Sequence, residues 1–329
     1  MTRKTTHRTL YITFSGALVI SLNVMAPFGY SALAADLPAF RAEDVFEMEY
    51  ANDPQVSPDG SRVAYVRGSM DIMTDRTRRT IWVVDIDGDN HRPLVSGAGN
   101  FSSPRWSPSG DRLAYLSNTE GKTQLFVQWF DGGETAKVTT LPQSPRSIVW
   151  SPDGEHIAFT RFVPATPPTL ADMPAKPKGA KWAEPATVVD RMTFRFDGGG
   201  YLPTGNQQVF VVPADGGTPR QMTTGNYPIS GSVSWMPDSQ SIVFSSNRRE
   251  NVEYHPRQND LYAASMATGE LTQMTDQAGP EGNPAVSPNG RYLAYTSAAD
   301  TRQGYNRADL RVRDLTSGES RSITCLLYT

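Results

Sequence analysis

Cysteine is almost absent from this sequence, with Cys325 as the one example in 329 residues. These residues therefore cannot form an intramolecular disulfide, and their fold must be stabilised by its core. The net charge is only −3, which excludes the strongly basic surface that nucleic-acid binding requires, so we expect no nucleic-acid partner. No G-x-S-x-G pentapeptide occurs, so the nucleophile turn of an α/β-hydrolase is not encoded here.

Charged residues are also missing from a long N-terminal stretch. Arg3, Lys4 and Arg8 form a basic start, and the next charged side chain is Asp36. The apolar segment between them ends in Ala-Leu-Ala at 32–34, a pattern that signal peptidase cleaves. The sequence predicts a signal peptide over residues 1–34 and a periplasmic or secreted chain with no membrane span after cleavage. An uncleaved membrane anchor is the alternative, because the stretch is long enough to cross a bilayer.

A short repeat organises the rest of the sequence. A segment of the type Trp/Val-Ser-Pro-Asp-Gly occurs five times, with its prolines at Pro58, Pro108, Pro152, Pro237 and Pro288. Proline presets φ for the first corner of a tight turn, and Asp-Gly tolerates the positive φ that follows, so each copy predicts a hairpin. Alternating apolar runs follow the turns, at 63–66, 113–116, 157–160, 242–245 and 293–296, and predict second strands.

A further β-rich run with its own glycine turn completes every repeat. These runs lie at 81–84, 125–127, 209–212, 261–264 and 310–313. Two hairpins per 40 to 50 residues make a four-stranded antiparallel sheet, and such sheets in tandem are typical of β-propeller blades. The predicted fold class is all-β, a β-propeller with five blades over residues 48–324 that follows an N-terminal segment at 35–47.

The third repeat contains an insertion at 163–206. Its first half is rich in proline and is predicted to be an exposed excursion, whereas 188–196 alternates enough to predict a strand. Long loops on a propeller scaffold tend to carry function. Arg191 and Arg195 are therefore the candidate substrate-binding residues, because a guanidinium can pair with a peptide carboxylate. Ordinary cross-strand salt bridges are the alternative.

Other possible centres fail on their spacing. Asp85, Asp87 and Asp89 are spaced like calcium ligands, but glycine falls at 88 and the closing glutamate is missing, so we interpret them as a hairpin turn. The three histidines of the mature chain fall in different repeats, which does not favour a catalytic triad. We predict no catalytic residue, metal or cofactor within this sequence.

The first blade resembles the opening of prolyl oligopeptidase family serine peptidases, bacterial acylaminoacyl-peptidase and dipeptidyl-peptidase members in particular. The residues that carry the resemblance are 44–46, 53–60 and 63–67, and the insertion's Arg191-x-x-x-Arg195 and residues 217–223 fit the same relatives. The resemblance implies a propeller of seven or so blades that admits short peptides to a C-terminal α/β-hydrolase domain with a Ser-Asp-His triad. This sequence does not contain that domain, so no catalytic residue is carried over.

Two alternatives to a peptidase propeller remain, and one alternative concerns the C-terminal tail. A TolB-like periplasmic propeller carries similar turns and acts as a protein-interaction module, although the first blade here follows the signal peptide after about a dozen residues. A complete five-bladed ring is the second. Residues 325–329 are predicted to be a non-native tail, because one frame of a transposon end used in sequencing-library preparation encodes them; a native C-terminal strand is the third alternative.

We expect the mature chain to begin at Ala35, since the small residues before it suit signal peptidase. An intact-mass measurement on exported protein checks this start. A chain in the membrane fraction that still begins at Met1 would contradict cleavage.

Overall fold

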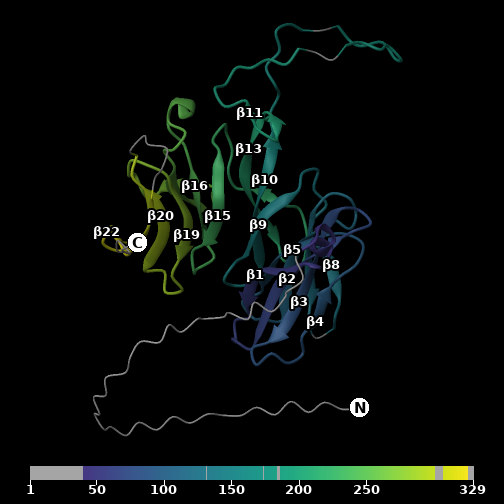
Figure 1. Ribbon diagram of the computed structural model, residues 1–329. Coiled ribbons are helices and arrows are strands. Elements are labelled where there is room, and N and C mark those ends of the chain that lie inside the picture. Colours follow the sequence, from purple (N-terminus) through teal and green to yellow (C-terminus); the bar gives the residue numbers. More distant parts are fainter. Residues whose placement is uncertain (1–39, 131, 173, 184–185, 301–306, 325–329) are drawn as a thin grey trace, which may run out of the picture. The chain divides into compact units, whose positions relative to one another are not determined.

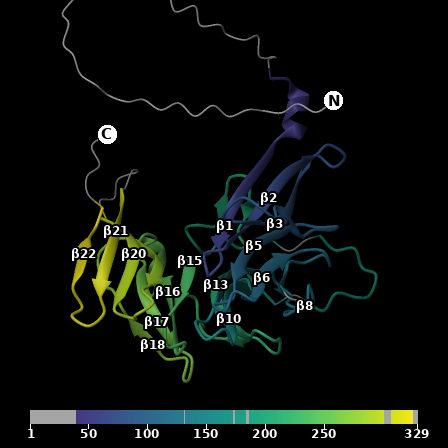
Figure 2. The same ribbon diagram turned by 90° about the horizontal axis from the view of Figure 1, so that it is seen from below.

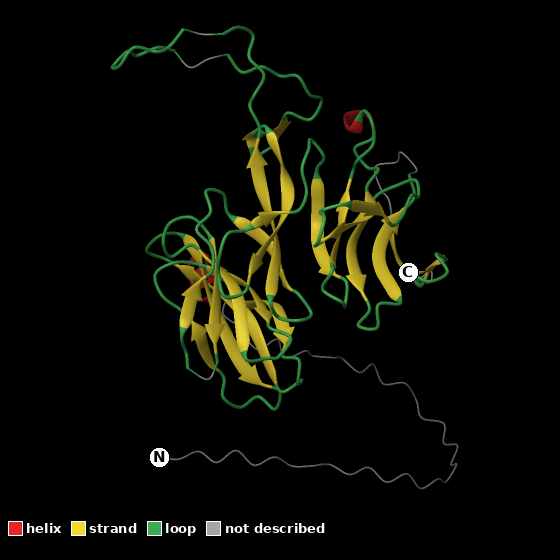
Figure 3. Ribbon diagram, turned by 180° about the vertical axis from the view of Figure 1, so that it is seen from behind, coloured by secondary structure: helices red, strands yellow, loops and turns green. Residues whose placement is uncertain are grey.

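The computed structural model describes residues 40–130, 132–172, 174–183, 186–300 and 307–324. Its regular structure is antiparallel strand apart from two short 3₁₀ helices in the described residues, η1 (Ala42–Glu47) and η2 (Val252–Tyr254) (Figure 3). Within this part of the chain no helix has the length and apolar character that a membrane crossing needs. The predicted signal peptide and the tail at 325–329 lie outside the described residues.

Five four-stranded antiparallel sheets, blades 1 to 5, follow one another along the chain (Figures 1 and 2). Blade 1 holds β1 (Glu49–Val56), β2 (Arg62–Asp71), β3 (Arg76–Asp85) and β4 (Arg92–Val95). Blade 2 holds β5 (Phe101–Trp106), β6 (Arg112–Ser117), β7 (Gln124–Trp129) and β8 (Thr135–Lys137). Blade 3 holds β9 (Pro145–Trp150), β10 (His156–Pro164), β13 (Gly205–Pro213) and β14 (Arg220–Gln221). Blade 4 holds β15 (Ile229–Trp235), β16 (Ser241–Ser246), β17 (Asp260–Ser265) and β18 (Leu271–Gln273). Blade 5 holds β19 (Glu281–Val286), β20 (Tyr292–Ala298), β21 (Ala308–Asp314) and β22 (Ser320–Ser322). The predicted all-β fold of four-stranded blades is confirmed.

The Ser-Pro-Asp-Gly repeat forms the turn between the first two strands of a blade. In blade 1 the Gly60 amide donates to the Ser57 carbonyl over 2.9 Å, and Gly60 has φ 74°, a region that favours glycine. The Ser57 hydroxyl donates to Asp59 and accepts the Arg62 amide at 2.9 Å. Hydrogen bonds from the Ser57 and Ser61 hydroxyls lower the pKa of Asp59 to about 2. Equivalent serine-to-backbone bonds recur in blades 2, 3 and 5, so the motif stabilises its own turn.

The tryptophan that begins three of the repeats joins its blade to the preceding one. The indole Nε1 of Trp106, Trp150 and Trp235 donates to the backbone carbonyl of Gln55, Arg105 and Val149, over 3.0, 2.9 and 3.3 Å respectively. In each case the acceptor is the residue just before the first residue of the Trp/Val-Ser-Pro-Asp-Gly motif in the preceding blade. The donor and the acceptor therefore occupy the same two positions of the repeat in each of these pairs of blades. Blade 5 has Val286 at this position, and valine cannot donate this bond.

Apolar residues fill the seams between successive blades. Each of the four seams has its own cluster of buried residues, and those between blades 1 and 2, 2 and 3, and 3 and 4 hold ten to thirteen residues of the described chain. The cluster between blades 4 and 5 holds four, Val243, Leu261, Leu293 and Tyr295. The seam that lacks the tryptophan bond therefore also has the smallest core.

The insertion leaves blade 3 at the end of the β10–β13 pair (Figure 1). These strands are paired in unbroken register as far as Pro164 and Gly205, and 165–204 lie beyond them. The described insertion forms one small hairpin of β11 (Arg195–Phe196) and β12 (Gly200–Tyr201). The predicted strand over 188–196 is wrong except for its last two residues. Residues 188–194 run beside no other strand in the described chain, and alternation alone supplies no ladder partner.

We expect Trp150→Phe to lower the free energy of unfolding by about 1–2 kcal/mol, because the Arg105 carbonyl loses a buried donor. Trp182→Phe, in the insertion and 41% exposed, is the matched control and should change stability by less than about 0.5 kcal/mol. Urea unfolding measures both. Equal effects of the two substitutions would contradict a structural role for the indole bond.

Candidate functional site

The candidate site is the surface formed by the insertion and the loop that follows β16 in blade 4. The Met192 amide donates to the Glu253 carboxylate in η2 over 3.0 Å. Nearer the base of the insertion, the Asn206 side chain donates to the Asn226 side chain over 2.7 Å. Both segments leave their blades after the second strand, so they share one end of blades 3 and 4. The insertion is thus tied to blade 4 and not only to the blade that carries it.

The two predicted arginines have different surroundings. Arg191 is partly buried, and its Nη2 donates to the Leu202 carbonyl over 3.0 Å. Arg195 is exposed on β11, in register with Tyr201 of β12. No carboxylate of the described residues lies within ion-pair distance of either guanidinium. Arg191 therefore fastens the two sides of the hairpin together, whereas Arg195 is available to solvent.

Exposed aromatic side chains lie on the same hairpin as Arg195. Phe196 and Tyr201 are 60% and 62% exposed, and Phe194 packs on Tyr201 with ring centroids 6.2 Å apart. Aromatic rings on a short hairpin offer apolar contact area at a small cost in conformational entropy. Arg195 adds an exposed guanidinium, a group that can pair with a carboxylate.

A pocket of about 520 Å³ lies beside this hairpin's contact with blade 4. It is lined by 225–227 and 249–254. The Arg248 guanidinium lies 4.2 Å from the Tyr227 ring centroid, and Arg249 Nη2 is 3.5 Å from Asp260 Oδ2. The repeat-based prediction missed this arginine pair, although its position immediately after the second strand of blade 4 is visible in the sequence. Within the described residues no serine hydroxyl is hydrogen-bonded to a histidine ring.

Acidic clusters elsewhere are accounted for by turns. Asp153, Glu155 and His156 hold potential metal-ligand atoms within 4.8 Å of one another, but Asp153 Oδ1 accepts the Glu155 amide at 2.9 Å as part of its own Ser-Pro-Asp-Gly turn. Asp85 lies at the β3–β4 hairpin, where its carbonyl accepts the Gly88 amide over 2.9 Å.

Sequence comparisons divide the chain into two matching regions. Residues 34–165 match the TolB beta propeller domain family, and 181–301 match the dipeptidyl peptidase IV N-terminal region family. An uncharacterized peptidase, YuxL, of Bacillus subtilis is 31% identical over 210 residues, which are 64% of this chain and 31% of that protein. Dipeptidyl-peptidase 5 of Porphyromonas endodontalis is 26% identical over 280 residues, or 78% of this chain and 38% of the relative.

A solved structure shows the same fold. The acylaminoacyl peptidase of Pyrococcus horikoshii superimposes with a TM-score of 0.61 at 18% identity, covering 84% of this chain and 40% of that one. The described chain is therefore a β-propeller. Its resemblance to the N-terminal propeller part of prolyl oligopeptidase family peptidases is confirmed. The chain spans only about a third of the length of the curated peptidases that it matches.

We expect Arg191→Ala to speed chymotrypsin cleavage at the hairpin aromatics several-fold, because the hairpin loses the bond to Leu202. Arg195→Ala is the matched control and should leave the cleavage rate unchanged, since Arg195 is exposed. Limited proteolysis followed by mass spectrometry measures both rates. Similar rates for the two variants would show that Arg191 does not hold the hairpin.

Proposed function

We propose that this chain is the substrate-gating propeller of an exported serine peptidase that releases dipeptides or acylated amino acids from short peptides. The observation that carries the proposal is the match of 181–301 to the dipeptidyl peptidase IV N-terminal region, because this stretch includes the end of the insertion, with its hairpin, and the blade 4 loop bound to it. The peptidase relatives support the reaction class.

In this proposal the propeller binds and selects while a hydrolase domain catalyses. Peptide hydrolysis needs an activated nucleophile and an oxyanion site in one place. The blades supply turns and half-buried strand faces, so the triad must belong to a C-terminal α/β-hydrolase domain outside this sequence. A propeller beside that domain would admit short peptides and exclude folded proteins by size. No cofactor takes part in this chemistry.

Arg195 is the proposed substrate-orienting residue. Its exposed guanidinium would pair with the carboxylate of a peptide, while Phe196 and Tyr201 contact the neighbouring side chain. Arg191 would act through the hairpin, because its hydrogen bond to Leu202 positions the strand on which Arg195 lies.

A TolB-like interaction module is the second candidate function. The match of 34–165 to the TolB beta propeller domain favours it. The two functions differ in what the gene encodes after codon 324: further blades and a G-x-S-x-G segment support the peptidase, and a genuine stop supports the binding module.

In the full-length gene product we expect Arg195→Ala to raise KM for short peptides about five-fold with little change in kcat. The reason is that the substrate loses an exposed ion pair worth ~1 kcal/mol. Arg76→Ala, at an exposed position of β3 in blade 1, is the control. Steady-state kinetics and a melting curve are measured for each. Unchanged kinetics with a lowered melting temperature would assign Arg195 to structure instead.

A further inference from the structure

The seam between blades 4 and 5 carries carboxyl groups where the other seams carry neutral ones. The residue of the first strand that faces the preceding blade is Phe101, Pro145 and Ile229 in blades 2 to 4, and Glu281 in blade 5. In the third strand, the residue just before the buried apolar run is Gln124 in blade 2 and Gln208 in blade 3, but Asp260 in blade 4.

Glutamine at this position completes a local network that aspartate does not. Gln124 accepts from the Thr139 hydroxyl at 3.0 Å and donates to the Leu141 carbonyl at 3.0 Å. In blade 4 the equivalent Thr275 hydroxyl still accepts the Leu261 amide over 2.9 Å, yet Asp260 Oδ1 is buried without a hydrogen-bond partner. Aspartate has no N–H with which to replace the amide's donor bond.

Glu281 is buried against this aspartate. Glu281 and Asp260 are each 1% exposed, and neither carboxylate oxygen of Glu281 has a hydrogen bond of ordinary geometry. The Glu281 amide donates to the Asn259 carbonyl over 2.9 Å, and the Glu281 carbonyl accepts the Ser245 hydroxyl at 2.6 Å. These bonds hold the backbone of β19 on blade 4 and keep the carboxyl group inside the seam.

The charges around Glu281 favour its neutral form. Burial is the main cause that raises the pKa of Glu281 to about 7; Asp260 and Asp276 act in the same direction, and the Thr275 hydroxyl and the Arg311 guanidinium act against it. Burial also raises the pKa of Asp260, although the Arg249 guanidinium, with Nη2 at 3.5 Å from Asp260 Oδ2, acts to lower it. Arg311 donates to Gln277, so part of its hydrogen-bonding capacity is used elsewhere.

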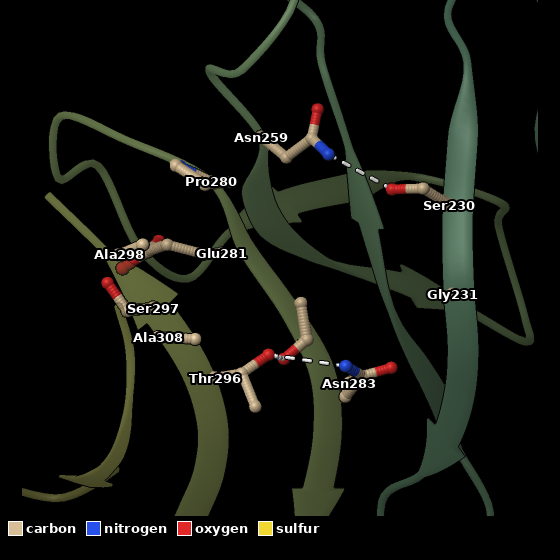
Figure 4. A pocket seen from close by; sticks show the side chains of 11 residues that line it. Ser230, Gly231, Asn259, Pro280, Glu281, Asn283, Thr296, Ser297, Ala298 and Ala308 are labelled. Carbon is tan, nitrogen blue, oxygen red and sulfur yellow. Dashed lines mark hydrogen bonds between the residues drawn. The ribbon is translucent and has the colours of Figure 1, made fainter. Parts of the chain in front are cut away.

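This seam also has fewer buried apolar residues than the other three seams of the described chain. It lacks the indole bond, since blade 5 has Val286, and its apolar cluster holds four residues. A pocket of about 320 Å³ opens between the two blades, with Ser230, Asn259 and Thr296 among its lining residues (Figure 4). An ionised Glu281 would therefore find water after a small opening of the blades.

We propose that the blade 4–blade 5 seam is a pH-sensitive latch, closed while Glu281 keeps its proton and loosened when Glu281 ionises and is drawn toward water. Because the carboxyl binds its proton more tightly in the folded chain than in the unfolded one, its stabilising contribution is complete below about pH 4.5 and is lost as the pH rises through about 7. The inference does not depend on the proposed peptidase function.

Melting temperatures of the full chain from about pH 5 to about pH 8 test the latch. The wild-type melting temperature is expected to fall by several degrees over this range, and that of Glu281→Gln by less than half as much. Glu270→Gln, an exposed glutamate of blade 4, is the matched control and should follow the wild type. A wild-type fall that Glu281→Gln leaves intact would overturn the proposal.

Hydrogen exchange in the wild-type chain tests the opening without a variant. After correction for the intrinsic exchange rate, protection of 281–298 should fall by up to about tenfold per pH unit between about pH 4.5 and about pH 7, while that of 101–117 in blade 2 stays unchanged. Equal changes in both segments, or none in 281–298, would contradict a local latch.

Discussion

The hydrogen bond from an indole N–H to the carbonyl of the preceding blade is the contact that sets how blades 2, 3 and 4 each pack on the blade before them. A buried indole needs an acceptor, and Trp106, Trp150 and Trp235 each find one at the same step of the neighbouring repeat. A slip of one residue would remove this acceptor and turn the apolar face of the strand outward. The bond therefore links the local turn chemistry of the motif to packing between sheets that are distant in sequence.

The candidate substrate-binding residues lie on a segment that leaves this framework. The insertion is rooted in the unbroken β10–β13 pairing and is fixed a second time by the Met192–Glu253 bond. Arg195 and its aromatic neighbours are thus carried on an anchored hairpin and not on a free loop. Such an arrangement fits the substrate-orienting role proposed for Arg195.

Much of the fold could be predicted because its signals are local. Proline, Asp-Gly and the alternating runs determine each hairpin within about fifteen residues, and the structure has strands where those runs lie. The failed strand at 188–194 shows the limit, since alternation says nothing about whether a partner strand exists.

Groups that depend on contacts between blades could not be predicted in this way. The burial of Glu281 follows from its pairing with Asn259 of the preceding blade, and Arg191 reaches Leu202 through the path of the insertion. An alignment of the repeats does offer one usable signal, which is a threonine fourteen residues after the first apolar residue of the third strand. The hydroxyls of Thr139, Thr223 and Thr275 stand at this position, and each accepts the backbone amide of that apolar residue. Placing Asp260 in that alignment singles out the exceptional seam.

Labelling of the full-length gene product with a serine-reactive phosphonate, mapped by peptide mass spectrometry, tests the central claim most directly. If the propeller is a non-catalytic gate, the label falls on one serine in a hydrolase segment C-terminal to Thr324, and 35–324 remain unlabelled. Label on a serine within 35–324, or hydrolysis of an aminoacyl substrate by those residues alone, would contradict the account.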